Sequence, residues 1–451
     1  VQAARCVAQL QAKPLQSATE ASSTMTVGIA ILALLIALYA AVADRLGRWS
    51  ITMPMVFVLA GFVLGPAVTN LLPISPDSET VKSLTEITLA VLLFADASTL
   101  QLSEVRRDAG MPGRLLAIGL PLTIVCGAAA ALLLQPQEGL VFACLLGTIL
   151  APTDAALGLP IFNNPRVPVR IRRALNVESG LNDGIATPFV LLFLALAAAS
   201  GEPQQGHWVF TAVEEIVLAG VAGSVVGFLG SWVLTQATRR SWTSEGAERL
   251  GIFALAIAAY FVSLAIGGNG FIAAFVGGIV FRHASHEQFV EPTEFTETFG
   301  TLLSLIVWAI FGAVLVADAL RLTHDWRPIA YALASLTLVR MVPVGLAMIG
   351  TGLRRDTVAL MGWFGPRGLA SVVFTLLALA HFQEINRPID ILLASATWTI
   401  LFSVMAHGLS AAPLSIWYAR RLEKAPGQLA ELEEMPELYQ RRKALEGRVT
   451  A

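Results

Sequence analysis

The sequence predicts an all-α polytopic membrane protein, and three observations lead to that prediction. Apolar residues make up 55% of the 451 residues and charged residues only 14%, whereas a soluble domain carries about 25% charged residues. The mean hydropathy is strongly positive, at +0.69. Apolar stretches of roughly 20 residues, the length at which a helix crosses a bilayer, recur along almost the whole chain.

The remaining composition excludes several classes of protein. A net charge of −2 gives no reason to expect nucleic acid as a partner. The three cysteines, Cys6, Cys126 and Cys144, have no paired spacing, so we expect neither a disulfide framework nor a cysteine metal site. Residues 1–26 form a polar N-terminal tail without the apolar core of a signal peptide. Met25 precedes the first apolar stretch, and we expect it to be the biological start or the end of a disordered tail.

Thirteen apolar segments between residues 27 and 418 are the predicted membrane spans of a single transport domain. The region 250–282 is too long for one span of a hydrocarbon core about 30 Å thick. Because Gly267-Gly268-Asn269-Gly270 interrupts it, we divide it in two. In order, the predicted spans are 27–43, 51–72, 84–100, 114–134, 139–159, 172–198, 208–235, 250–266, 270–282, 300–318, 328–350, 357–379 and 390–418.

Charge in the loops predicts how these spans are oriented. With this division, 22 Lys and Arg residues lie on one side, including seven in the C-terminal tail 419–451, and six lie on the other. Cytoplasmic loops are the ones enriched in Lys and Arg. We therefore expect an inner-membrane protein with its N-terminus outside and a cytoplasmic tail, which from Arg420 onward has the pattern of an exposed helix.

The first unusual polar group in the membrane lies in the fifth span. Thr153 and Asp154 follow Pro152, which lacks an N–H and clashes with the preceding helical turn. The helix should therefore break in mid-membrane, where its freed backbone groups need protein or a watery cavity. Broken helices of this kind build ion sites in secondary transporters.

The sixth span carries a polar face. Glu178 and Asn182 are four residues apart, as are Ser179 and Asp183, so all four side chains fall on one side of a helix. Carboxylate, hydroxyl and amide oxygens suit an alkali cation, whereas zinc prefers histidine and cysteine.

Two arginines lie inside later spans. Arg340 is in the middle of the eleventh span, and Arg367 is in Gly-Pro-Arg-Gly in the twelfth, a run that should unwind the helix as Pro152 does. A buried Arg needs a carboxylate partner, and we pair Arg340 with Glu178. Asp183 then remains as the carboxylate that releases a proton and takes a cation.

Structural roles are the alternative for several of these residues. Polar side chains in a span also join helices to one another, and this explains the Glu178–Arg340 pair and Arg367 as well as a functional role does. Asp154 can serve by compensating helix-end dipoles at the break.

The motifs Ala-Pro-Thr-Asp and Glu-Ser-Gly-Leu-Asn-Asp-Gly resemble those of the cation:proton antiporter superfamily, in its electroneutral sodium/proton branch. Gly-Asn-Gly-Phe-Ile-Ala-Ala-Phe-Val-Gly-Gly and Gly-Pro-Arg-Gly resemble further blocks of that family. The resemblance covers about residues 27–418.

The resemblance implies two inverted repeats, spans 1–6 and 8–13, in which the broken spans 5 and 12 cross. It also implies a homodimer scaffold of spans 1–3 and 8–10 and an ion-binding core of spans 4–6 and 11–13. By the same resemblance, sodium is bound by Asp183, Glu178, Ser179 and Thr153, supported by Asn182, Asp154, Arg340 and Arg367. Electrogenic relatives carry a second Asp where this chain has Asn182.

These inferences predict a secondary transporter in which sodium and protons compete for Asp183, with no cofactor. The substrates would be protons and sodium, potassium or lithium, and the partners would be membrane lipid and a second copy of the chain. A potassium/proton antiporter of the same fold is the main alternative. An intramembrane aspartyl protease using Asp154 and Asp183 lacks its Gly-x-Gly-Asp signature, and a gated channel would conduct without coupling.

Overall fold

The fold is all-helical, and the description that follows is of a computed structural model. The structure describes the backbone of residues 2–74, 78–99, 110–154, 157–158, 161, 164–199, 208–286, 288–321, 324–385, 388–424 and 429–433. Within these ranges the side chains are also described, except those of residues 2–24, 198–199, 208–209 and 290.

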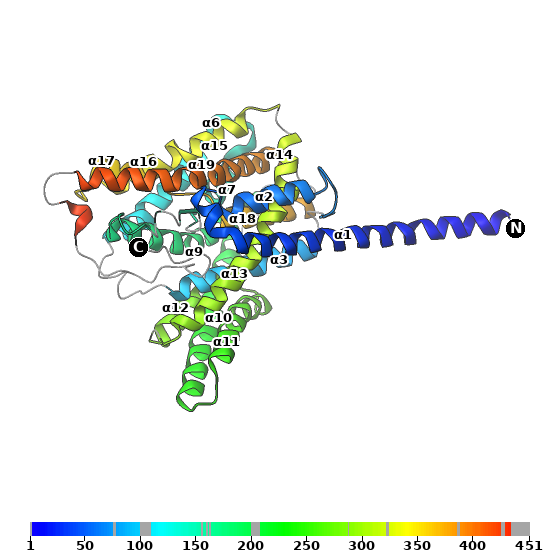
Figure 1. The fold of residues 1–451 in the computed structure, drawn as a ribbon, viewed down its shortest axis with the longest axis horizontal. Helices are drawn as coiled ribbons and strands as arrows, with labels where there is room; N and C mark the ends of the chain where they lie inside the picture. The colour runs from blue at the N-terminus through cyan, green and yellow to red at the C-terminus, as the bar shows by residue number, and fades with distance from the viewer. Residues whose placement is uncertain are drawn as a thin grey trace.

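Helices account for nearly all of the described chain (Figure 1). The first half contains α1 (Gln2–Arg48), α2 (Met53–Leu64), α3 (Glu79–Thr99), α5 (Gly110–Arg114), η1 (Leu115–Gly119), α6 (Leu120–Leu134), η2 (Pro136–Glu138), α7 (Gly139–Ile149), α9 (Val169–Ala199) and α10 (Trp208–Arg239). The second half contains α11 (Glu245–Ala265), α12 (Gly270–Ala284), α13 (Val290–Phe311), η3 (Gly312–Val316), α14 (Ala317–Arg321), α15 (Arg327–Leu336), α16 (Leu338–Ala347), α17 (Arg355–Trp363), α18 (Leu369–Glu384), α19 (Asp390–Glu423) and η4 (Ala430–Leu432).

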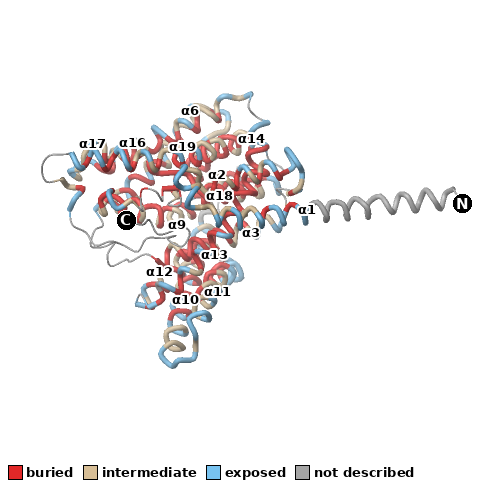
Figure 2. The backbone as a smooth tube through the Cα atoms, viewed as in Figure 1, coloured by how far each residue is buried: buried red, intermediate tan, exposed pale blue. Residues whose placement is uncertain are grey.

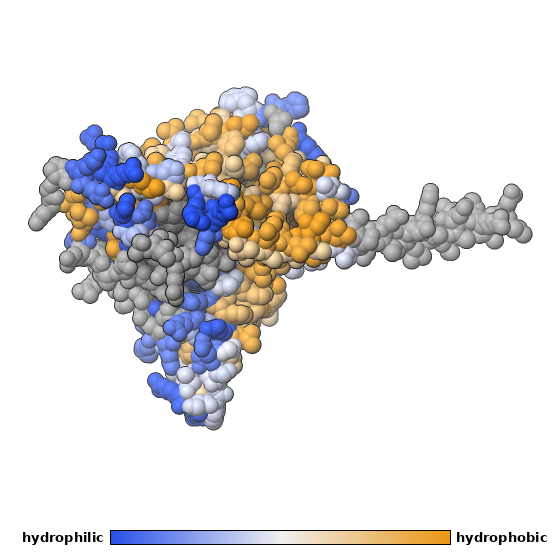
Figure 3. All heavy atoms as spheres, in the orientation of Figure 1, coloured by the Kyte–Doolittle hydropathy of each residue, from blue (hydrophilic) through white to orange (hydrophobic). Residues whose placement is uncertain are grey.

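Eight helices within the described residues are long and apolar enough to cross a membrane. Large apolar side chains on several of them are exposed, for example Leu133 at 83% and Leu338 at 67%. Figure 3 shows such side chains forming a broad hydrophobic surface on one face, with hydrophilic groups toward its edges. Buried residues follow the inner helices instead (Figure 2). An apolar surface of this kind marks contact with lipid rather than with water.

The predicted division of region 250–282 is confirmed. Helix α11 ends at Ala265 and α12 begins at Gly270. Between them Gly267 has a φ of +83°, which favours glycine. The Asn269 side chain then accepts hydrogen bonds from the main-chain N–H groups of Phe271 and Ile272, at 3.0 and 3.2 Å, and so caps α12.

Some predicted boundaries were wrong. The span expected over 51–72 ends as a helix at Leu64, because the proline at 66 forces Gly65 into an extended conformation, with φ −72° and ψ 179°. The polar tail 1–26 has a helical backbone from Gln2 onward and is continuous with α1.

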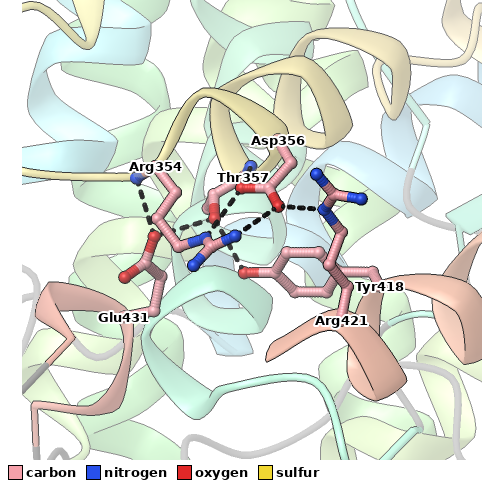
Figure 4. A network of polar contacts seen from close by, with 6 residues as sticks. All are labelled: Arg354, Asp356, Thr357, Tyr418, Arg421 and Glu431. Atoms are coloured by element: carbon pink, nitrogen blue, oxygen red, sulfur yellow. Dashed lines mark hydrogen bonds and ion pairs between the residues drawn. The ribbon is translucent and has the colours of Figure 1, made fainter. Parts of the chain in front are cut away.

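The C-terminal tail also differs from the expected exposed helix. Helix α19 continues to Glu423, and the chain at Leu429–Glu433 lies against the starts of α9 and α17. Glu431 is only 1% exposed, since its Oε1 accepts bonds from the Arg354 main-chain N–H and the Thr357 hydroxyl, both at 2.8 Å (Figure 4). Residues 434–451 of the predicted tail lie outside the described residues.

Candidate ion-binding site

Two helices are interrupted in the interior, at the places that Pro152 and Gly365-Pro366 predict. Helix α7 ends at Ile149, and the described residues 150–154 are not helical. Helices α17 and α18 are separated by residues 364–368, which are also not helical. The two non-helical segments meet, because the main-chain N–H of Asp154 donates to the carbonyl oxygen of Pro366 at 2.8 Å.

Asp154 caps the helix on the far side of this meeting point. Its Oδ2 accepts a hydrogen bond of 3.1 Å from the main-chain N–H of Leu369, the first residue of α18. A carboxylate at this position satisfies a free N–H and complements the positive end of the helix dipole. Gly368 lies against the same side chain, so closely that an added Cβ would overlap it.

Arg367 binds a main-chain carbonyl group just beyond the C-terminal end of α7. It is fully buried, and its guanidinium group donates to the carbonyl oxygens of Ala151 and Ser335 at 3.1 and 3.4 Å. The carbonyl groups that follow the end of α7 lack helical partners, and a cation there complements the negative end of the dipole. The general expectation of a carboxylate partner therefore does not describe Arg367, whose hydrogen bonds here go to main-chain oxygens.

The polar face of α9 contacts this crossing at Thr153. The Ser179 hydroxyl donates to the Thr153 carbonyl oxygen at 2.7 Å. The Asn182 amide donates to the Thr153 hydroxyl oxygen at 2.6 Å. All three residues are buried. Three of the predicted site residues are therefore joined directly.

Glu178 and Arg340 form the predicted ion pair. Two guanidinium nitrogens donate to the two carboxylate oxygens, at 2.6 and 2.9 Å, and both side chains are 2% exposed. This bidentate arrangement is the strongest form of such a pair. Arg340 is brought to α9 by the irregular residue Thr337, whose φ of −111° and ψ of −90° separate α15 from α16.

Asp183 follows Asn182 in α9 and is half-buried. The next residue, Gly184, lies against the ring of Phe275 in α12, where an added Cβ would overlap the ring. Asp183 is therefore placed near the contact between α9 and α12, helices that the resemblance would assign to the core and to the scaffold.

Thr153, Asp154 and Ser179 place hydroxyl, carboxylate and main-chain carbonyl oxygens at the meeting of the two non-helical segments, and Asp183 adds a second carboxylate on the same face of α9. Such hard ligands suit an alkali cation, and a carboxylate among them can bind a proton instead. Ser403 and His407 of α19 also contact the crossing. The sequence analysis missed them, although a Ser and a His four residues apart inside an apolar span were a usable signal.

Comparison with known proteins gives a consistent family and fold. The family model for the transmembrane sodium/hydrogen exchanger matches residues 30–417. The chain is 27% identical over 358 residues to the Na(+)/H(+) antiporter NhaP of Pseudomonas aeruginosa, covering 75% of this chain and 82% of that protein. It is 26% identical over 348 residues to the K(+)/H(+) antiporter NhaP of Alkalimonas amylolytica, covering 76% of this chain and 58% of that one.

A solved structure is similar over most of the chain. The sodium proton antiporter MjNhaP1 from Methanocaldococcus jannaschii at pH 8 aligns with a TM-score of 0.69, covering 88% of this chain and 99% of that one. Sequence identity is 19%, so this likeness concerns the fold.

Proposed function

This chain belongs to the transmembrane sodium/hydrogen exchanger family, and from that premise we propose that it exchanges sodium for protons by competition at Asp183. Membership makes it a multi-pass membrane antiporter of monovalent cations and protons, not an enzyme, so the aspartyl protease and channel alternatives fall away.

The observation that carries the proposed site is the attachment of the α9 polar face to the crossing. Ser179 and Asn182 both bond to Thr153. The oxygen-rich face of α9 therefore lies against the non-helical residues 150–154, which in turn contact the non-helical residues 364–368. Glu178 has both carboxylate oxygens bonded to Arg340, so its counter-charge is already supplied. Asp183 is then the group that alternates between a proton and a cation, with Thr153, Ser179 and Glu178 completing the ligand set.

The same proposal extends to the architecture. Thirteen spans in two inverted repeats, with the broken spans 5 and 12 crossing, would place the site near the middle of the membrane. The core of spans 4–6 and 11–13 would move against a dimeric scaffold of spans 1–3 and 8–10. The loop charges favour an outside N-terminus and a cytoplasmic tail.

Potassium is the second candidate substrate. It is favoured by the similarity to a protein named as a K(+)/H(+) antiporter, at 26% identity, almost the same as the similarity to the sodium antiporter. Both cations bind hard oxygen ligands.

Ion-driven proton flux in proteoliposomes tests the proposal. The protein is reconstituted with a pH-sensitive dye inside the vesicles, and sodium, potassium and lithium are added in turn. We expect sodium to change the internal pH and Asp183→Asn, which keeps the size of the side chain but cannot titrate, to abolish that change while remaining monodisperse. Flux near the wild-type rate in Asp183→Asn would refute the role of Asp183.

A further inference from the structure

The unwound segment between α17 and α18 is attached to α19 by two side chains. This segment, Phe364–Gly368, contacts the other non-helical segment, because the Pro366 carbonyl oxygen accepts a hydrogen bond from the main-chain N–H of Asp154. Pro366 has no N–H, and the main-chain N–H of Arg367 points instead to α19, where it donates to the Ser403 hydroxyl oxygen at 2.6 Å. The backbone of this segment therefore depends on a side chain from another helix.

His407 extends the same connection to the other end of the break. Its Nδ1 lies 3.2 Å from the Ser403 hydroxyl oxygen, and its Nε2 lies 2.7 Å from the carbonyl oxygen of Trp363, the last residue of α17. The imidazole also lies against the Trp363 ring, with centroids 5.0 Å apart. Ser403 and His407 are 0% and 1% exposed. A continuous chain of hydrogen bonds thus joins both edges of the unwound segment through α19.

The chemistry of the partners assigns each proton in this chain. The Trp363 carbonyl only accepts, so Nε2 carries a proton and donates it. The Ser403 hydroxyl accepts from the Arg367 N–H and donates its own proton to Nδ1. The Ser403 carbonyl oxygen is also 2.9 Å from Nδ1, and a charged ring could donate to both carbonyls. A third cation beside the buried guanidinium groups of Arg340 and Arg367 would be costly, so the neutral ring is favoured.

The position of the unwound segment affects the proposed ion site because its glycines pack directly against side chains of that site. Gly365 lies against the Arg340 guanidinium group and Gly368 against the Asp154 side chain, each so closely that an added Cβ would overlap its neighbour. Arg340 in turn holds Glu178. A shift of residues 364–368 would therefore move Asp154 and the Arg340–Glu178 pair.

We propose that Ser403 and His407 are positioning residues that hold the unwound segment in the geometry needed for cation binding. This inference rests on the proposed function, because it assigns the two residues to the same site. Loss of a group that orients metal ligands typically weakens metal affinity by about 10-fold to 100-fold. We expect effects of that kind on cation affinity, with a smaller effect on the maximal rate.

Transport kinetics on four variants test this proposal. Ser403→Ala and His407→Leu should raise the apparent KM for sodium on the order of 10-fold. His407→Gln keeps a donor for the Trp363 carbonyl and cannot be charged, so it should restore most of the affinity. The matched control is Thr399→Val, one turn earlier on α19. Thr399 is also fully buried, and its hydroxyl bonds to Ser395 rather than to the unwound segment, so its KM should stay within about twofold.

Hydrogen–deuterium exchange of the same proteins gives a readout independent of transport. Amides of residues 364–369 should exchange faster in Ser403→Ala and His407→Leu than in the wild type and Thr399→Val. Unchanged KM and unchanged exchange protection in Ser403→Ala would overturn the proposal, as would equal effects of Ser403→Ala and Thr399→Val. If the wild type itself carries no cation-driven proton flux, the proposed function fails, while the exchange data still decide whether α19 holds the segment.

Discussion

The two carboxylates on α9, those of Glu178 and Asp183, have different surroundings, and we propose different roles for them. Glu178 is buried with both oxygens bonded to Arg340, whereas Asp183 is half-buried near the contact with α12. The guanidinium group of Arg340 already supplies the counter-charge of Glu178, so the proposal assigns the exchange of a proton for a cation to Asp183. The proposal therefore rests on a difference between the partners of two carboxylates on one helix.

Competition at Asp183 predicts a pH-dependent apparent affinity for the cation. Where protons occupy Asp183, each fall of one pH unit should raise the apparent KM for sodium roughly tenfold, because one proton displaces one cation. The measurement is initial proton flux against sodium concentration at several pH values. Glu384→Gln, which removes an exposed carboxylate paired with Lys82, is the control and should keep the same slope. A constant KM between about pH 6 and pH 9, with only the maximal rate changing, would favour a separate pH sensor.

The ion pair of Glu178 and Arg340 predicts strong energetic coupling. Removing either partner leaves the other buried without its counter-charge, at a cost of about 3–5 kcal/mol. Glu178→Ala and Arg340→Ala should each lower the stability in detergent, and the double variant should cost less than the sum of the two. A matched cycle on the exposed pair Asp318–Arg321, with side chains 53% and 71% exposed, should give coupling of about 0–1 kcal/mol. Additive effects at Glu178 and Arg340 would contradict the pairing.

At the scale of elements, the sequence predicted the breaks and a dipole-compensating role for Asp154 as one alternative, but not which helix end each polar residue stabilises. Pro152 and Gly365-Pro366 mark the interruptions through local backbone chemistry, which a single sequence contains. Asp154 bonds to the first residue of α18, and Arg367 bonds to Ala151 beyond the end of α7. Each bond joins residues more than 200 positions apart. Contacts of that kind depend on tertiary packing, so residue pattern alone did not predict them.

The same distinction explains which helix predictions succeeded. The hairpin at Gly267–Gly270 was predicted because the glycine-rich run that interrupts the apolar stretch is a local signal, whereas the partners of Ser403 and His407 depend on which segment packs against α19. The Glu178–Arg340 pair was predicted, despite its separation, because two opposite charges buried in membrane spans need each other. The cost of burying an unpaired charge thus allowed a contact between residues far apart in the sequence to be predicted.

Close packing at the crossing predicts a sharp effect of adding one methyl group. Gly368→Ala places its Cβ on the Asp154 side chain, and such overpacking typically costs about 1–3 kcal/mol. We expect a lower melting temperature and weaker sodium affinity. Gly345→Ala in α16 is the matched control, because no atom lies within 4 Å of the added Cβ, and alanine should stabilise the helix by up to about 1 kcal/mol. Wild-type stability and affinity in Gly368→Ala would mean that the two segments do not touch.

At the scale of the whole molecule, the predicted core and scaffold are joined by both polar contacts and apolar packing. Lys82 at the start of α3 forms a 3.0 Å ion pair with Glu384 at the end of α18. The contact of Gly184 with Phe275 lies beside the ion site. The Lys82–Glu384 pair, with side chains 31% and 58% exposed, is of a kind that contributes little to stability, whereas buried apolar residues of both predicted parts form one hydrophobic cluster.

Asp356, in the first turn of α17, adds a pH-dependent contribution to stability. Bonds from Arg354, together with those from Arg421 and the Thr357 N–H, lower the pKa of Asp356 to about 2 (Figure 4). A lowered pKa means that the stabilisation is complete above the unfolded value of about 3.9 and is lost as pH falls toward 2. Asp356→Asn should therefore lower the melting temperature at neutral pH, and its difference from the wild type should shrink below about pH 4. Asp318→Asn, at an exposed pair, should change little, and a pH-independent effect of Asp356→Asn would contradict the assignment.

Counting charges over the whole site predicts that transport is electroneutral. Asn182 cannot titrate and Glu178 is bonded to Arg340. Under the proposal Asp183 alone alternates between a proton and a cation, so one proton should exchange for one monovalent cation. The membrane potential, worth about 2.3 kcal/mol per charge per 100 mV, should then neither drive nor resist the exchange. In liposomes clamped with valinomycin and potassium, under conditions where potassium is not itself transported, the sodium-driven pH change should be unaltered. A steady potential generated by a sodium gradient alone would show that a second group also carries a proton, and Asp154, at the crossing, would be the first residue to substitute.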